Sequence, residues 1–127
     1  MSRQIIHSDA APAAIGPYSQ AVRVGSTVYL SGQTPLDPVT MKLVEGDVSV
    51  QAQQVFKNLA EVCKAGGGDF SKVVRVGIYM TDLGNFAKVN EVMKQHFAEP
   101  FPARSTIGVA ALPLGAQVEI DLVMVLD

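Results

Sequence analysis

The chain has 127 residues, which is the length of one domain and is enough to bury a hydrophobic core without disulfides. Its net charge is −2 and its basic residues form no run, which argues against nucleic acid as the main ligand. Charged residues make up only 17% of the chain, below the usual quarter, so we expect part of the surface to be buried against other copies. An uncharged but solvated surface would give the same composition.

The single cysteine, Cys63, allows no internal disulfide and fits a reducing compartment. No stretch approaches the roughly 18 apolar residues of a membrane span, and the N-terminus has no signal-like apolar run. We therefore expect one domain over residues 1–127, located in the cytoplasm, with no membrane partner.

The N-terminal part of the chain predicts a loop followed by a hairpin. Residues 1–17 contain two prolines and a glycine and are expected to be irregular. Residues 20–24 and 27–31 alternate between apolar and polar side chains, and they flank Gly25-Ser26. This pattern is typical of a β-hairpin with a two-residue turn.

A long loop and a helix are expected next. Residues 32–46 contain Pro35, Pro38 and Gly46, and they leave room for a short strand near 42–44. Residues 47–65 have helical spacing, with Asp47 or Ser49 able to cap the first turn and the glycines at 66–68 able to end the helix. One stripe of this helix is apolar and is expected to face the core: Ala52, Val55, Phe56, Leu59, Val62 and Cys63.

The second half of the chain predicts strands at 73–81, 105–110 and 117–126 and a helix at 86–97. The first of these strands is expected to have an apolar face: Val74, Val76, Ile78 and Met80. The helix is expected to have one as well: Phe86, Val89, Val92, Met93 and Phe97.

The resulting order is β-β-α-β-α-β-β, which favours an α+β fold with two helices on one face of a mixed sheet. The other sheet face is polar or small rather than simply charged: Arg75, Gly77, Tyr79, Gln117, Glu119 and Asp121. We expect this second face to pack against neighbouring subunits around pockets that hold water or a ligand.

Several common site motifs are missing from the sequence. The glycines at 66–68 follow a helix and lack the rest of a phosphate-binding loop, so a helix end explains them better. His7, His96 and Cys63 show no metal-ligand spacing, and no GxSxG nucleophile elbow is present. His96 lies at the margin of an apolar stripe and Cys63 lies within one, so both are expected to be packing residues. No metal site is therefore expected.

A few polar residues are harder to explain by structure alone. Glu119 stands between two apolar residues of a strand. It could lie on a solvated face, which is the simpler explanation, or in a pocket suited to proton transfer. Asp121 shares that face about 7 Å away, and spacing does not rank the two. Arg104 enters a strand, and its planar fork suits a substrate carboxylate, although surface arginines are common.

Two further segments could face a cleft. Ser31-Gly32 ends a predicted strand, where the serine hydroxyl and an exposed backbone N–H can face a cleft. The alternative is that these two residues only form a turn. Tyr18 follows Gly16-Pro17, and most tyrosines in such a position simply pack.

Taken together, these residues resemble a known family. The segment 13–21, AAIGPYSQA, is similar to the N-terminal signature of the RidA-type reactive intermediate deaminases, the YjgF group. The similarity continues in order through nearly the whole chain: LSGQ at 30–33, DL at 82–83, FAKVN at 86–90, FPARS at 101–105, AALP at 110–113 and VEI at 118–120.

The resemblance implies a fold like that of the monofunctional bacterial chorismate mutases. Three subunits then pack their sheets into a central barrel, with a cleft at each interface of the homotrimer. The implied substrates are small molecules: 2-aminoacrylate, 2-iminopropanoate and 2-iminobutanoate. The implied products are 2-oxo acids and ammonia. The family uses no metal and no organic cofactor.

The resemblance also implies roles for individual residues. Arg104 matches the arginine that holds the substrate carboxylate, and members without it are generally not deaminases. Glu119 matches the acid that orients the attacking water. Tyr18, Ser31 and the backbone of Gly32 match groups that line the same cleft.

Three more positions bear on the expected cleft. Asn90 matches a polar residue near the interface. Thr106 stands where many relatives carry cysteine, so it keeps a small polar group but removes the oxidisable thiol, and we count it among the substrate-binding residues. Gly108 stands where some relatives carry glutamate.

Two other functions stay open from the sequence. A trimer that binds or senses 2-oxo acids or amino acids without turning them over would look much the same. RNA cleavage with inhibition of translation has been linked to relatives, and the acidic balance of this chain argues against nucleic acid as its partner.

Overall fold

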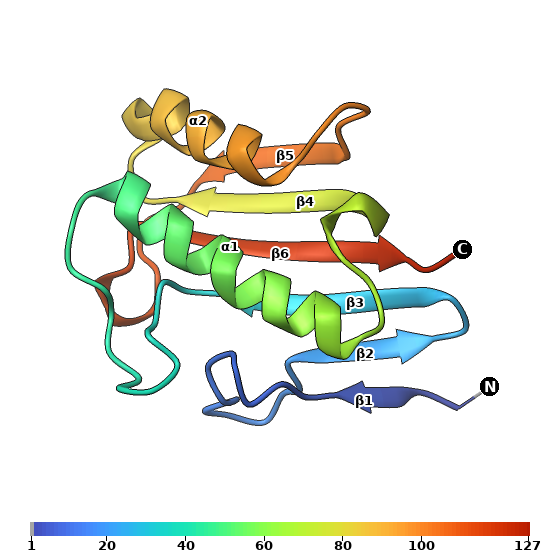
Figure 1. The fold of residues 1–127 in the computed structure, drawn as a ribbon. Helices are drawn as coiled ribbons and strands as arrows, with labels where there is room; N and C mark the ends of the chain where they lie inside the picture. The colour runs from blue at the N-terminus through green and yellow to red at the C-terminus, as the bar shows by residue number, and fades with distance from the viewer. Residues whose placement is uncertain (1) are drawn as a thin grey trace.

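The computed structural model describes residues 2–127, which form a six-stranded sheet with two helices packed on it (Figure 1). The strand order is β1-β2-β3-β6-β4-β5, and every neighbouring pair is antiparallel except β4 and β5. The strands are β1 (Gln4–Ile6), β2 (Ala21–Val24), β3 (Thr27–Gln33), β4 (Val73–Met80), β5 (Ala103–Gly108) and β6 (Val118–Val125). The helices are α1 (Val48–Ala65) and α2 (Phe86–His96), with 3-10 turns η1 (Phe70–Lys72), η2 (Leu83–Asn85) and η3 (Pro113–Gly115).

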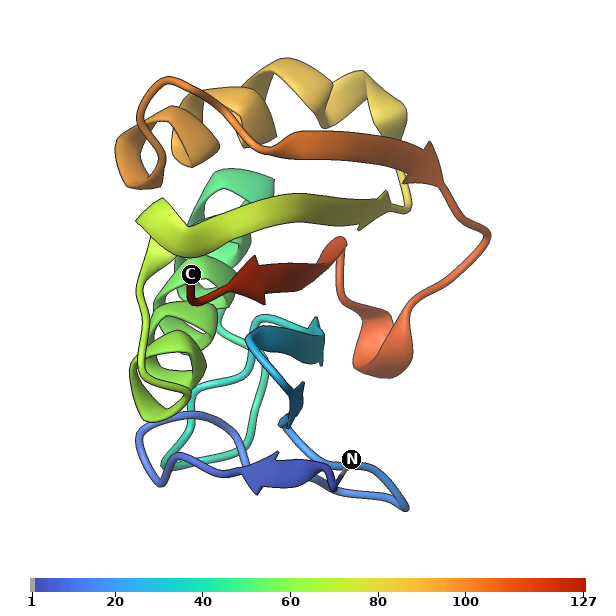
Figure 2. The same ribbon diagram turned by 90° about the vertical axis from the view of Figure 1, so that its right-hand side faces the viewer.

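The predicted fold class is confirmed, because both helices lie on one face of a mixed sheet. Figure 1 shows α1 crossing in front of the central strands, and Figure 2 shows from a second direction that it stays on one side of the sheet. None of the helices described here is both long enough and apolar enough to cross a membrane.

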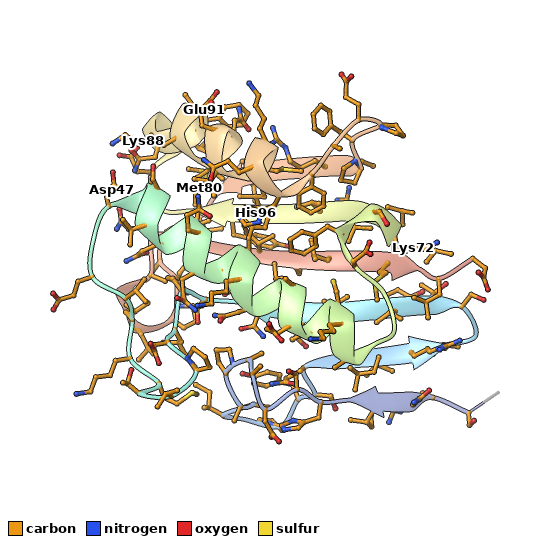
Figure 3. The ribbon with its side chains drawn as sticks, viewed as in Figure 1. Asp47, Lys72, Met80, Lys88, Glu91 and His96 are labelled. Carbon is orange, nitrogen blue, oxygen red and sulfur yellow. The ribbon has the colours of Figure 1, made fainter. Side chains whose placement is uncertain are left out.

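Helix α1 begins and ends as the sequence predicts. The Asp47 side chain accepts hydrogen bonds from the backbone N–H groups of Ser49 and Val50 at 3.0 and 3.1 Å, so Asp47 rather than Ser49 is the N-cap. The predicted stripe is buried throughout, and Gly67 adopts a positive φ of 91° just past the helix end. Asp47 also pairs with Lys88 of α2 at 3.6 Å, and the two lie near each other in Figure 3.

The N-terminal segment corrects one prediction. Residues 1–17 were expected to be irregular, but residues 4–6 form β1, which pairs with β2 so that Ile6 lies opposite Ala21 in the core. Three residues are too few for an alternating pattern to show in the sequence. The short strand expected near 42–44 is reduced to a single bridge between Leu36 and Leu43.

Strand β4 corrects a second prediction. Val74 was expected in the core, yet 47% of it is exposed, because the register of β4 against β6 shifts between Val73 and Arg75. This bulge leaves Val74 without a partner on β6, and Val73 is buried in its place, opposite Met124. Strand β5 also begins two residues earlier than expected, so Arg104 lies within it.

Four of the five residues predicted for the apolar face of the second helix are buried: Val89, Val92 and Met93 within α2, and Phe97 at the position after its last residue. The fifth, Phe86, is exposed at the first turn and lies against the side chain of Arg104 instead of the core.

The loop between β3 and α1 is held by one buried polar side chain. The amide nitrogen of Asn58 donates to the backbone carbonyls of Leu36 at 2.9 Å and Thr34 at 3.4 Å, and its oxygen accepts from Gln54 at 2.9 Å. Because Asn58 is almost fully buried, water cannot replace these partners. Asn58 therefore fixes the path of the loop across α1.

Replacing this side chain should destabilise the fold. We expect Asn58→Ala to lower the free energy of unfolding by about 2 kcal/mol, because it leaves the Leu36 carbonyl without its donor. Urea unfolding at a fixed protein concentration measures this loss. Lys57→Ala changes an exposed neighbour on the same helix and should alter stability by less than about 0.5 kcal/mol. Equal losses in the two variants would contradict the assignment.

Candidate active site

The site residues predicted from the sequence fall into two groups in the structure. Tyr18, Ser31, Gly32 and Glu119 line a pocket of about 410 Å³ beside β3 and β6. A second group lies along β5 and α2, where a pocket of about 380 Å³ is lined by residues that include Asn90, Met93, Phe101 and Arg104. We call these the glutamate half-site and the arginine half-site.

The two half-sites lie on opposite faces of the sheet. Glu119 pairs with Tyr79 of β4, and Arg104 pairs with Val76 of the same strand. Positions 76 and 79 are three residues apart, so their side chains leave the sheet in opposite directions. Arg104 therefore shares the helix-covered face with Val76, whereas Glu119 points to the bare face.

A bulge in β3 shapes the glutamate half-site. Leu30 pairs with Leu122 and Gln33 with Ile120, so two residues of β3, Ser31 and Gly32, lie opposite one residue of β6. The sequence prediction that the strand ends at these residues is therefore wrong, because β3 continues to Gln33. The bulge brings the backbone of Gly32 against the Glu119 side chain.

Gly32 leaves the space that the glutamate occupies. A β-carbon added at Gly32 would overlap the Glu119 carboxylate and lie only 2.9 Å from its Cδ atom. The Ser31 hydroxyl donates to the backbone carbonyl of Ser19 at 2.6 Å, so its oxygen remains free to accept a hydrogen bond. Tyr18 is exposed, and its hydroxyl accepts a long 3.4 Å hydrogen bond from the Ile15 N–H.

The fold raises the pKa of Glu119, the carboxyl group of this half-site. The side chain is half-buried, and burial is the larger cause that raises its pKa, with the negative charge of Asp121 the second. A carboxyl group with a raised pKa is a stronger base when it is ionised, which suits it to accept a proton from water.

The arginine half-site holds its guanidinium in place before any substrate arrives. One Arg104 nitrogen, Nη1, donates to Asn90 Oδ1 at 2.7 Å and lies 3.6 Å from the Met93 sulfur. The guanidinium carbon lies 5.3 Å from the centre of the Phe86 ring, within cation–π range. The other guanidinium nitrogens remain available for a carboxylate.

Thr106 lies in the same half-site, two residues along β5 from Arg104 and on the same face. Its Oγ1 atom is buried and has no hydrogen-bond partner among residues 2–127. Buried hydroxyl groups are usually paired, and Thr106 is not among the residues that line the pocket of this half-site.

Sequence reasoning missed the residues that orient Arg104. Phe86 and Met93 were assigned to the core of α2, but Phe86 lies over the guanidinium and the Met93 sulfur contacts it. The spacing of Phe86 and Asn90, four residues apart on a helix, was the signal that both face the same way.

The two packing predictions are confirmed. The His96 ring stacks on Phe56 with a centroid distance of 5.1 Å, and its Nε2 atom lies 2.8 Å from Gln53 Oε1, so it packs between the helices (Figure 3). Cys63 is fully buried, and burial raises the pKa of its thiol to about 12, which makes it unreactive at neutral pH.

Comparison with known families identifies the chain. The family described as Ribonuc_L-PSP, Endoribonuclease L-PSP, matches residues 8–126. The chain belongs to this family. This result confirms the family resemblance that the sequence motifs predicted.

Relatives in the Ribonuc_L-PSP family resemble the chain over nearly its full length. Protein DfrA of Myxococcus xanthus is 58% identical over 127 residues, covering 98% of this chain and 97% of the relative. The human 2-iminobutanoate/2-iminopropanoate deaminase is 47% identical over 123 residues, covering 97% and 90%. The crystal structure of RidA from the Antarctic bacterium Psychrobacter sp. PAMC 21119 matches with a TM-score of 0.93 at 51% identity, covering 96% of this chain and 98% of that one.

The contact between Gly32 and Glu119 gives a direct test of the glutamate half-site. We expect Gly32→Ala to push the carboxylate out of its position and lower activity by roughly 100-fold, because displacements of about 1 Å in a site have effects of this size. Thermal unfolding should change little, since the end of the Glu119 side chain can move. Gly67→Ala is not a suitable control, because its positive φ adds strain. Ser26→Ala is a suitable control, because it changes an exposed side chain in a turn. Full activity in Gly32→Ala would contradict the role of Gly32 in leaving space for the Glu119 carboxylate.

Proposed function

We propose that this protein is a hydrolytic deaminase that converts 2-imino acids, such as 2-iminobutanoate and 2-iminopropanoate, and their enamine tautomers into 2-oxo acids and ammonia. The observation that carries the proposal is the half-buried Glu119, held against the Gly32 bulge with a raised pKa. It occurs in a family whose relatives include proteins named 2-iminobutanoate/2-iminopropanoate deaminase. The Arg104 fork supplies a matching group for the substrate carboxylate.

We further propose that the active protein is a homotrimer with its sites between subunits. In one subunit, Arg104 and Glu119 lie on opposite sheet faces, so neither half-site contains both a carboxylate clamp and a base. A head-to-tail interface repeated around a three-fold axis would bring Arg104 of one subunit to Glu119 of the partner subunit. Large apolar side chains on the bare sheet face support this packing: Tyr29 is 54% exposed and Ile107 is 49% exposed.

In the proposed mechanism, two nitrogens of Arg104 bind the substrate carboxylate and fix the imine carbon beside a water molecule. Glu119 accepts a proton from that water as its oxygen attacks the imine carbon, and the imine nitrogen gains a proton. The resulting tetrahedral adduct loses ammonia as the carbonyl forms, so one imine and one water give one 2-oxo acid and one ammonia. An enamine substrate first takes a proton on carbon and releases one from nitrogen, which gives the imine.

The remaining residues orient these partners. In this mechanism the Gly32 N–H and the Ser31 oxygen bind the water or the adduct beside Glu119, and Tyr18 covers the pocket that these residues line. In the arginine half-site, on the other side of the proposed interface, Asn90 fixes Arg104 of its own subunit. The unpaired Thr106 hydroxyl can donate to the substrate carboxylate.

The endoribonuclease name of the family does not change the proposal. The glutamate half-site is a pocket of about 410 Å³, which is the size of a small-molecule site. The chain carries a net charge of −2, whereas RNA binding generally depends on a basic surface. We also propose the cytosol as its compartment, because the single cysteine fits a reducing environment.

The arginine assignment is tested by following imine decay. An amino-acid oxidase generates 2-iminopropanoate in place, and semicarbazide traps the imine that survives. We expect the wild type to prevent trapping, and Arg104→Ala to lose roughly 100-fold or more in kcat/KM, because the substrate is no longer held in position. Arg104→Lys keeps the charge but not the fork, so it should restore little activity. Undiminished hydrolysis by Arg104→Ala would refute the assignment.

The shared site is tested by mixing inactive variants. Arg104→Ala and Glu119→Gln subunits, refolded together, should regain activity although each alone is inactive. Random mixing in a three-fold ring pairs an intact arginine with an intact glutamate in about a quarter of the sites, so about a quarter of wild-type activity is expected. The double variant Arg104→Ala/Glu119→Gln mixed with either single variant is the control and should stay inactive. No recovery of activity in co-refolded trimers would contradict a site shared between subunits.

A further inference from the structure

A second carboxylate lies beside Glu119 on the bare face of the sheet. Asp121 is two residues along β6, so its side chain points the same way, about 7 Å further along the strand. Tyr79 of β4 is the register partner of Glu119, and its hydroxyl donates to Asp121 Oδ2 at 2.9 Å. The tyrosine therefore links the position of Asp121 to the strand pair that carries Glu119.

Because Gly77 has no side chain, it leaves space for the hydrogen-bonded pair of Tyr79 and Asp121. It is the register partner of Asp121, and a β-carbon added there would lie 3.1 Å from the Tyr79 hydroxyl and 3.2 Å from Asp121 Cγ, and would overlap the nearer carboxylate oxygen. The tyrosine hydroxyl and the aspartate carboxylate thus occupy the space above a residue without a side chain. Two glycines, Gly32 on β3 and Gly77 on β4, flank the two carboxylates of β6.

Within one subunit, Asp121 is the charge that acts on Glu119. In the proposed trimer Arg104 of the partner subunit also faces Glu119, and it is the same in the wild type and in every variant of Asp121 or Tyr79. Of the groups that face Glu119 from its neighbours, Tyr79 on β4 and Tyr18 in the N-terminal loop are tyrosines and not carboxylates. Arg75, also on this face of β4, is exposed and donates to Ser105 Oγ on β5 at 3.1 Å, away from β6. The hydrogen bond to Asp121 is the main cause that raises the pKa of Tyr79, which keeps the phenol protonated as a donor.

We propose that Asp121, fixed by the Tyr79 hydroxyl, is a positioning residue that makes Glu119 a stronger base through the repulsion between their like charges. The inference rests on the proposed function, in which Glu119 accepts the proton of the attacking water. A like charge on the same face disfavours ionisation of Glu119 and brings its proton affinity closer to that needed near neutral pH. Removal of the Asp121 charge therefore makes Glu119 easier to ionise and weaker as a base.

The decisive variant is Asp121→Asn, which keeps the shape of the side chain and removes its charge. The Glu119 titration is followed by carboxyl ¹³C NMR of the substrate-free protein, with Glu119→Gln identifying the resonance. We expect its pKa to fall by roughly 0.5 to 1 unit in Asp121→Asn. The acidic limb of the kcat/KM profile should move to lower pH by the same amount, with a lower plateau. Tyr79→Phe removes the hydrogen bond to Asp121 and leaves that carboxylate free to rotate. It should lower the Glu119 pKa and move the acidic limb to lower pH, in each case by less than Asp121→Asn.

Glu45→Gln is the matched control, because it removes one negative charge from an exposed loop residue and should leave both quantities at their wild-type values. A Glu119 titration that is unchanged in Asp121→Asn overturns the inference. A merely structural role would lower activity or the unfolding temperature without moving the acidic limb. The NMR titration needs no turnover, so its result is separate from a failure of the proposed function, which would show as a wild type that does not accelerate imine decay.

Discussion

The structure depends on the alternation of side chains along β6. This strand lies between β3 and β4, and its buried residues, Val118, Ile120, Leu122 and Met124, form the floor beneath helix α1. Because successive side chains point to opposite faces, burial of these four fixes the direction of the residues between them. Glu119 and Asp121 must therefore emerge on the bare face, so the hydrophobic core determines where the carboxylates stand.

The neighbouring strands adapt to these carboxylates through small residues and irregular pairing. The bulge at Ser31 and Gly32 brings backbone rather than a side chain against Glu119, and Gly77 does the same beneath Asp121. A regular, fully substituted sheet would fill this space with side chains and push the carboxylates toward solvent. The pKa of Glu119 is raised mainly because that enclosure removes water from one side of it.

Patterns of period 3.6 and period 2 predicted most of the fold, because burial of one face imposes them on any long element. The stripe of α1, the hairpin and the alternating β6 are such elements. The exceptions are local: β1 is too short to show a period, and the bulge at Val74 interrupts the period of β4. The candidate residues were found from motifs, but their division into two half-sites depends on the register of β5 against β4, which no local pattern encodes.

In the proposed trimer, that division couples assembly to chemistry. A single subunit already holds both partly prepared halves: Arg104 is oriented by Asn90 and Phe86, and Glu119 is enclosed against Gly32. On the proposed arrangement neither half is useful alone, since one binds a carboxylate without a base and the other activates water without holding a substrate. Orientation is achieved during folding, so association has only to bring two rigid halves together. Activity of the proposed trimer then depends on protein concentration wherever it dissociates, because subunit binding and formation of the proposed site are one equilibrium.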